Sequence, residues 1–177
     1  SCQHILRDHR SGSPALHADM FRYAMLAQTD LTWVDMDVLC LQAFTPSSPY
    51  IFGYEDADTV NNAVLRLPRD SPALQQLLQY QPSTRGYPPF FSRSRRVKYW
   101  IKSGGCTPHI TRWPWGAIGP RGLTYHLNQT GEIRHALPQA VFYSVSSAEV
   151  LRLITAPDCI GSLQFPEQSR YLHLWGK

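Results

Sequence analysis

The sequence has no pair of cysteines at Cys-x-x-Cys spacing. Its four cysteines, Cys2, Cys40, Cys106 and Cys159, lie far apart in the chain. This spacing argues against a structural zinc site and favours reduced thiols, as in a cytoplasmic protein. The sequence also lacks an apolar run of about 18 residues and shows no signal-peptide pattern at its start. We therefore expect neither a transmembrane helix nor secretion.

Basic residues are missing between Asp30 and Leu65, although this segment carries two carboxylates inside a hydrophobic run. The run from Trp33 to Leu41 would predict a buried strand if it did not contain Asp35 and Asp37. In a strand both carboxylates point to the same side. Because an ionised carboxylate is costly to bury without a partner, a divalent cation with oxygen ligands is expected here. A solvated turn, or pairing with distant arginines, is the alternative.

An amphipathic helix is predicted just before this run, over residues 13–26. Ser13 is a suitable N-cap and Pro14 a suitable first residue. Apolar residues recur at helical spacing, at Leu16, Met20 and Tyr23. Asp19 and Arg22 lie three residues apart on one face, so they can pair with each other or reach together toward a ligand.

Together, Ala18-Asp19-Met20-Phe21-Arg22-Tyr23 and Trp33-Val34-Asp35-Met36-Asp37-Val38 resemble the sugar-nucleotide glycosyltransferases that carry a DXD motif in their sugar-binding region. The likeness is greatest to the bacterial family that groups with yeast initiating mannosyltransferases, α-1,4-sugar transferases and the clostridial glucosylating toxins. Members typically read Ser-Asp-x-x-Arg-Tyr, a Gly-Gly turn, then aromatic-x-Asp-x-Asp. Here Ala18 replaces the serine, and Ala27-Gln28-Thr29-Asp30 replaces the turn.

The resemblance implies a role for each motif residue. Asp35 and Asp37 would hold Mn²⁺ or Mg²⁺ against the diphosphate of a UDP- or GDP-hexose. Asp19 and Arg22 would bind hydroxyls of the donor sugar, and Trp33 would sit beside the donor. A metal would offset the negative charge of the departing diphosphate. Since retaining transfer through an oxocarbenium-like state needs no dedicated catalytic pair, no catalytic residue is assigned.

Weaker signals lie further along the chain. Asn62 would contact donor or acceptor, or else be a turn residue or a buried amide. Trp113 and Trp115 are candidates for an acceptor-sugar platform, with core packing as the alternative. The end of the chain, 171–177, alternates like a strand and resembles the family's terminal His-x-Trp. His173 would then be a third metal ligand, or a structural histidine, and Trp175 a further platform residue.

The predicted fold class is α/β, a GT-A-like mixed sheet flanked by helices, in one domain spanning 1–177. Capped helices are expected after Ser71 and Ser146, and a short strand over 140–143. Residues 80–108, rich in Pro, Gly, Ser and Arg, predict an irregular loop across the active-site face. The basic stretch from Arg93 to Lys102 is either a solvated face or a patch facing phosphate or the inner membrane surface.

Only 34 residues precede Asp35, too few for the βαβ nucleotide-binding half of a complete GT-A enzyme. We therefore expect a shortened N-terminus, whose exposed sheet edge would favour a homodimer.

Two functions of different class follow. The first is a metal-dependent hexosyltransferase acting on a glycan or lipid-linked acceptor, with no nucleic acid partner. The second is a non-catalytic module that binds sugar or a protein. A nuclease or phosphotransferase is less well supported, since it leaves Asp19, Arg22 and the terminal His-Leu-Trp unexplained.

Overall fold

The computed structural model describes residues 5–155 and 165–176. The chain forms two compact units, each built from two separate stretches. The first, here called the helical unit, comprises Ser1–Asp30 and Pro68–Ile133. The second, the strand unit, comprises Leu31–Leu67 and Arg134–Lys177. The chain leaves the helical unit after its opening helix, builds most of its strands, and then returns. The single domain expected over 1–177 stays a prediction.

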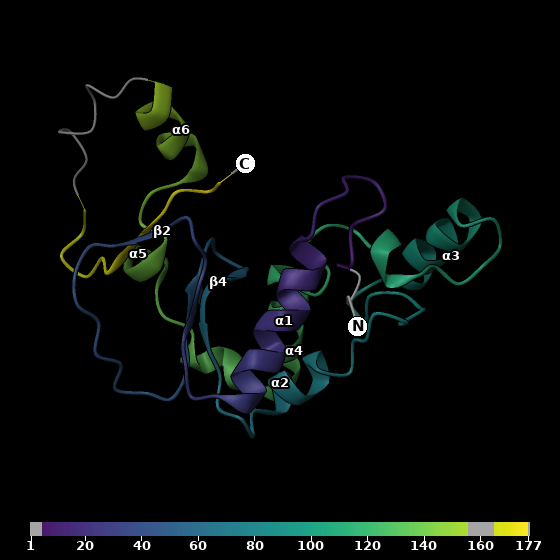
Figure 1. Cartoon of the computed structure of the whole chain (residues 1–177), viewed down its shortest axis with the longest axis horizontal. Coiled ribbons are helices and arrows are strands. Elements are labelled where there is room, and N and C mark those ends of the chain that lie inside the picture. Colours follow the sequence, from purple (N-terminus) through teal and green to yellow (C-terminus); the bar gives the residue numbers. More distant parts are fainter. Residues whose placement is uncertain (1–4, 156–164, 177) are drawn as a thin grey trace. The chain divides into compact units, whose positions relative to one another are not determined.

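The helical unit is built around three packed helices, shown in Figure 1. Its elements are α1 (Ala15–Gln28), α2 (Pro72–Leu77), α3 (Arg93–Lys102), η1 (Ile110–Arg112) and α4 (Pro120–Thr130). Helix α2 packs against both α1 and α4. Tyr23, Leu26, Leu74, Leu123 and Leu127 are fully buried in this unit. The short helix η2 (Glu132–His135) spans the point in the sequence where the chain enters the strand unit again.

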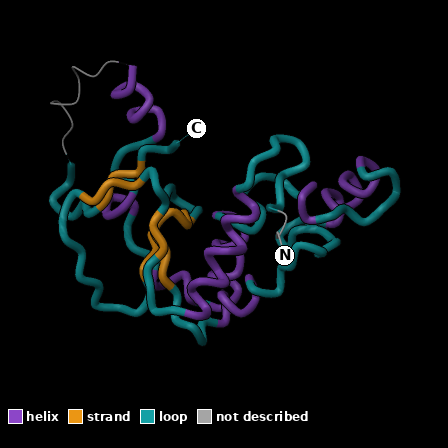
Figure 2. Tube along the Cα trace, viewed as in Figure 1, coloured by secondary structure: helices purple, strands orange, loops and turns teal. Residues whose placement is uncertain are grey.

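The strand unit contains two small antiparallel sheets, drawn in orange in Figure 2. Strand β4 (Val60–Arg66) lies between β1 (Trp33–Val34) and β3 (Ile51–Tyr54), and β2 (Val38–Cys40) pairs with β5 (Tyr171–His173). Helices α5 (Gln139–Phe142) and α6 (Ser147–Thr155) complete the unit. Its main core contains Ile51, Ala63, Val64, Phe142 and Tyr143. The α/β class is therefore confirmed, with antiparallel pairing within both sheets.

Two helices begin at their predicted serine caps, and a third begins near its predicted start. The Ser71 hydroxyl accepts from the Leu74 N–H at 3.2 Å. Ser146 and Glu149 form a reciprocal capping box, with N–H to oxygen distances of 3.3 and 2.8 Å. The third helix, α1, begins one residue later than predicted, so that Pro14 is its N-cap. These local signals hold because capping depends on neighbouring residues alone.

Two predicted elements are wrong. The supposed irregular region 80–108 contains helix α3, because Ser92 caps it and its arginines and lysines are good helix formers. Phe91 also anchors it, with its ring 4.9 Å from that of Tyr99. The supposed strand 140–143 lies largely within helix α5, which follows Pro138. A short apolar run of this kind does not distinguish strand from helix.

Within residues 5–155 and 165–176, no helix combines the length and apolar character required to cross a bilayer. Cys40 and Cys106 are free and exposed. The remaining two cysteines, Cys2 and Cys159, lie outside the described residues.

Candidate metal centre

Asp35 and Asp37 lie in a turn between β1 and β2. The Val38 N–H donates to the Asp35 carbonyl at 3.2 Å, and the Asp35 N–H donates to Ala63 of β4 at 2.8 Å. Met36, between the two aspartates, is 105% exposed. The solvated turn, which the sequence left open as the alternative, forms here, because two carboxylates one residue apart favour it over a continuous strand. The turn, and not strand alternation, places the carboxylates together.

Strand β5 brings a histidine to this turn from the other end of the chain. Val38 of β2 pairs with His173, and the Leu174 N–H donates to the Asp37 carbonyl at 2.7 Å, which extends the ladder. In Figure 1, β2 and the yellow C-terminal segment lie side by side. The His173 Nε2 atom lies 3.5 Å from Asp37 Oδ2. One ligand atom from each of Asp35, Asp37 and His173 lies within 4.8 Å of the others.

Hydrogen bonds orient both carboxylates. The Trp33 indole N–H donates to Asp35 Oδ1 at 2.5 Å. The Gly176 backbone N–H donates to Asp37 Oδ2 at 2.6 Å. A Cβ atom at Gly176 would lie only 2.9 Å from that same oxygen. Such outer contacts fix the direction of ligand oxygens. Nothing in the sequence pointed to the contribution of Gly176, because it arises from tertiary contact alone.

The His173 imidazole is 7% exposed and packs between aromatic rings. Its ring centre lies 5.7 Å from that of Tyr143 and 4.4 Å from that of Trp175. Burial lowers the pKa of His173 from its ordinary 6.5, while the carboxylates of Asp37 and Asp35 act in the opposite direction. The imidazole is therefore neutral near pH 7, which is the form that binds metals. Among the described residues, Nδ1 has no hydrogen-bond partner.

These three side chains are donors of the types that divalent cations bind. Carboxylate oxygens and imidazole nitrogen suit Mn²⁺, and carboxylate oxygens suit Mg²⁺. Ligand atoms bound about 2.1 Å from one octahedral ion are separated by roughly 3 to 4.2 Å. The ligand atoms of the three side chains lie within 4.8 Å of one another, slightly beyond this range. Asp35, Asp37 and His173 therefore form a candidate metal centre in the strand unit.

The structure places Asp19 and Arg22 in the helical unit, on α1. They form a buried ion pair with an N to O distance of 3.3 Å. The Asp19 carboxylate also lies at the start of α4, since a Cβ at its N-cap Gly119 would lie 2.8 Å from Asp19 Oδ2. Negative charge is favourable at a helix N-terminus. This pair thus has a structural role in its own unit, and its sugar-binding role stays a prediction.

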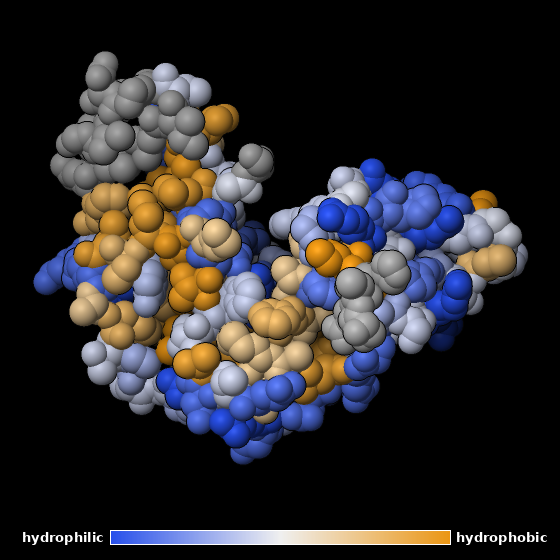
Figure 3. All heavy atoms as spheres, viewed as in Figure 1, coloured by the Kyte–Doolittle hydropathy of each residue, from blue (hydrophilic) through white to orange (hydrophobic). Residues whose placement is uncertain are grey.

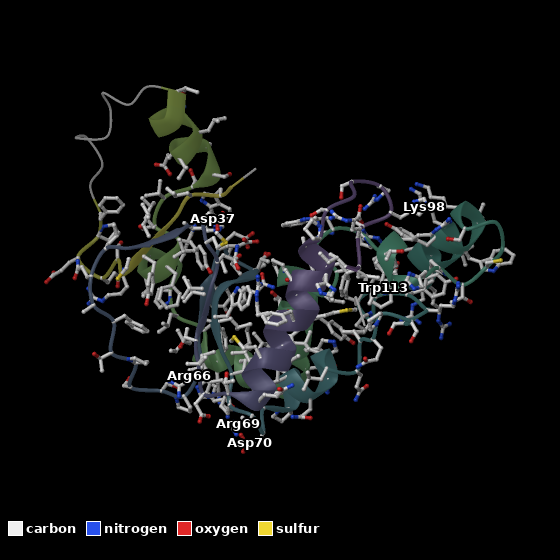
Figure 4. All side chains as sticks on the ribbon, in the orientation of Figure 1. Asp37, Arg66, Arg69, Asp70, Lys98 and Trp113 are labelled. Atoms are coloured by element: carbon white, nitrogen blue, oxygen red, sulfur yellow. The ribbon has the colours of Figure 1, made fainter. Side chains whose placement is uncertain are left out.

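The remaining predicted residues differ in their exposure. Trp113 is 3% exposed and donates its indole N–H to the Gly86 carbonyl at 2.9 Å, among the side chains of the helical unit (Figure 4). Core packing therefore accounts for Trp113, whereas Trp115 is 68% exposed and keeps a free ring face. Trp175 is half-buried beside His173. Asn62 is buried on β4, and no contact with a ligand follows from its position.

Comparison with known proteins does not assign this chain to a family. Searches with protein-family models, against curated proteins and against solved structures gave no match. The likeness of its Asp-x-Asp region to glycosyltransferases therefore stays a prediction. What can be concluded about function follows from the chemistry of the candidate metal centre.

Proposed function

We propose that Asp35, Asp37 and His173 bind Mn²⁺ or Mg²⁺ and that the chain is a metal-dependent glycosyltransferase with a GT-A-like active site. The substrate would be a UDP- or GDP-hexose, and the acceptor a glycan or a lipid-linked sugar. The observation that carries this proposal is the convergence of two carboxylates and a neutral imidazole within 4.8 Å of one another.

The charge of the cluster supports a cation as its ligand. Two carboxylates and a neutral histidine together carry a formal charge of about −2 near pH 7. Segment 31–64 contains no lysine or arginine that could neutralise them locally. The only cationic candidate within the cluster is His173, and burial opposes its protonation. A divalent cation would balance the charge of the two carboxylates.

The residues would contribute to transfer chiefly through position. A bound cation would stabilise the negative charge that develops on the departing diphosphate. Trp33 and Gly176 hold one oxygen of each aspartate, so the carboxylates keep their direction without a ligand. Such preorganisation lowers the reorganisation cost of the chemical step. Tyr143 and Trp175 exclude water from one side of His173.

The first test is calorimetric titration of Mn²⁺ into the purified chain and into its Asp37→Asn variant. Asparagine keeps an oxygen that can accept from the Gly176 N–H but removes the charge. We expect binding to weaken by at least about 10- to 100-fold, since even outer-shell changes have effects of this size. Asp58→Asn is the matched control, because Asp58 is exposed in the β3–β4 connection of the same unit.

The second step is titration of UDP-glucose and GDP-mannose with and without Mn²⁺. Metal-dependent binding of either nucleotide sugar would support a transferase, and hydrolysis or transfer of the sugar would then be measured directly. An Arg22→Gln variant tests the sugar-binding role of that residue, with its fold checked by circular dichroism because the pair is buried. Metal binding without nucleotide binding would favour a non-catalytic module. Unchanged Mn²⁺ affinity in Asp37→Asn would refute the metal centre.

A further inference from the structure

Helix α3 projects an almost fully exposed surface from the helical unit. Nine of its ten side chains are exposed, and Tyr99 is half-buried. The helix is attached mainly at its beginning, where Arg96 donates to the Phe91 carbonyl at 3.1 Å and the Arg95 guanidinium lies 4.3 Å above the Phe91 ring. Its remaining length is therefore available for contact with another surface.

Two faces of α3 differ in chemistry. Val97, Trp100 and Ile101 lie at i, i+3 and i+4, so they share one face, and they are 56%, 48% and 65% exposed. Arg95, Lys98 and Lys102 lie at i, i+3 and i+7 on another face, and Arg93 and Arg96 lie one turn before Val97 and Trp100. Lys98 is labelled on this helix in Figure 4. In Figure 3, hydrophilic side chains cover most of the same region, with hydrophobic ones among them.

The charge around α3 is of one sign. Between Ser71 and Gly131 the sequence has eight lysines and arginines and no aspartate or glutamate. A helix with basic residues on one face and tryptophan and aliphatic residues on another is typical of segments that lie in the interface of an anionic membrane. Lysine and arginine stems extend far enough for their charges to remain at the headgroups while the apolar face enters the acyl boundary.

We infer that α3 docks this protein onto an anionic lipid bilayer, with Val97, Trp100 and Ile101 inserted below the headgroups. A nucleic acid would match the basic face alone, because its phosphate backbone offers nothing to exposed valine and isoleucine side chains. The bilayer matches both faces, through charge complementarity with anionic lipids and burial of the apolar residues. This inference is independent of the metal centre, which lies in the other unit.

The experiment is flotation of the purified chain with vesicles of phosphatidylcholine alone or with 30% phosphatidylserine. We expect binding to the anionic vesicles only, and loss of binding in high salt. Lys98→Gln/Lys102→Gln should weaken binding by about 10-fold or more. Arg112→Gln/Arg121→Gln removes the same charge from exposed positions outside α3 and should have a much smaller effect.

Insertion is tested at constant charge. Val97→Ser/Ile101→Ser should weaken vesicle binding by about 10-fold, because two exposed aliphatic side chains no longer enter the bilayer. The tryptophan fluorescence of the wild type should shift to the blue on anionic vesicles, and Trp100→Phe should remove most of that shift. Since all these positions are exposed, the variants should fold normally. Equal binding by the α3 variants and the control, or tighter binding to duplex DNA than to vesicles, would overturn the inference.

Discussion

Each compact unit buries one histidine against aromatic neighbours, but the two imidazoles have different kinds of partner. In the helical unit, His126 Nδ1 lies 2.5 Å from Gln76 Oε1, and Nε2 lies 2.9 Å from the Tyr80 hydroxyl. Because the glutamine oxygen only accepts, Nδ1 carries the proton and Tyr80 donates to Nε2. Burial raises the pKa of Tyr80 to about 12, so this donor keeps its proton at any ordinary pH.

In the strand unit, His173 has carboxylates instead of neutral partners. Its Nε2 faces Asp37 at 3.5 Å, and Asp35 lies in the same cluster. Burial lowers the pKa of His173 and of His126 alike. A lowered pKa therefore does not separate a functional histidine from a structural one. The partners differ, since His126 has both nitrogens satisfied by neutral groups and His173 faces the carboxylates of Asp37 and Asp35.

The carboxylates show the same contrast. Glu132 is buried in the helical unit, where its Oε2 accepts from the Ala73 N–H at 2.8 Å and from the Thr130 hydroxyl at 2.7 Å. Asp19 is paired with Arg22. The strand unit instead gathers Asp35 and Asp37 beside a neutral imidazole. The buried acids of the helical unit are partnered by protein donors, whereas the acids of the strand unit form the cluster proposed to bind a cation.

Exchanging each histidine for alanine should separate the two roles most clearly. His126→Ala should destabilise the metal-free protein by about 2 to 3 kcal/mol, because Tyr80 and Gln76 lose their partner, while Mn²⁺ affinity is unchanged. His173→Ala should weaken Mn²⁺ binding by at least about 10-fold. Urea denaturation and metal titration measure the two quantities. The comparison fails if His126→Ala alters metal affinity or His173→Ala does not.

Two glycines permit a second, smaller contrast. A Cβ at Gly122 in α4 would lie 2.5 Å from the Ala117 carbonyl oxygen, which is backbone and cannot yield easily. Gly122→Ala should therefore cost about 1 to 3 kcal/mol of stability. At Gly176 the added Cβ would meet the end of the Asp37 side chain, which can rotate. Gly176→Ala should change stability by less than about 0.5 kcal/mol but reduce Mn²⁺ affinity up to about tenfold.

Thermal unfolding and metal titration of both glycine variants check this contrast. Equal losses of stability in Gly122→Ala and Gly176→Ala would contradict the expectation that backbone yields less easily to an added Cβ atom than the Asp37 side chain does. Normal Mn²⁺ affinity in Gly176→Ala would show that the direction of the Asp37 carboxylate is not critical.

The smallest expected effect concerns pH. Burial lowers the pKa of His126 below its ordinary 6.5, so the unfolded chain takes up a proton at a higher pH than the folded one. The stabilisation is present above pH 6.5 and is lost as pH falls through the folded-state pKa. His126→Gln should therefore lose less stability on acidification below pH 6.5 than the wild type does, as measured by the melting temperature.

His173 contributes in the same direction, because burial lowers its pKa too. In His126→Gln the dependence of the melting temperature on pH should therefore be reduced and not abolished. His9→Gln, at an exposed position, is the control and should keep the wild-type slope. If the melting temperature of His126→Gln fell more steeply on acidification than that of the wild type, the pKa of His126 would not be lowered by folding.

Local features of the fold were predictable because they depend on adjacent residues. The caps at Ser71 and Ser146 follow from side-chain oxygens that reach backbone N–H groups three residues away. Helix α3 was missed because its signal, a serine cap before a basic run, lay inside a segment rich in glycine and proline. The sequence left the turn at Asp35 as an alternative only, because the flanking apolar residues resemble a strand, although Met36 is fully exposed.

By itself the sequence determined the mixed α/β class, the starts of several helices, and the short-range pairing of Asp35 with Asp37. Only the tertiary structure decided that the chain divides into two units and that the strand of His173 lies beside that of Val38. Likewise, only packing decided that Trp113 is buried while Trp115 is exposed. The physical reason is range: caps and turns are set within a few residues, whereas the pairing of β2 with β5 joins segments more than a hundred residues apart.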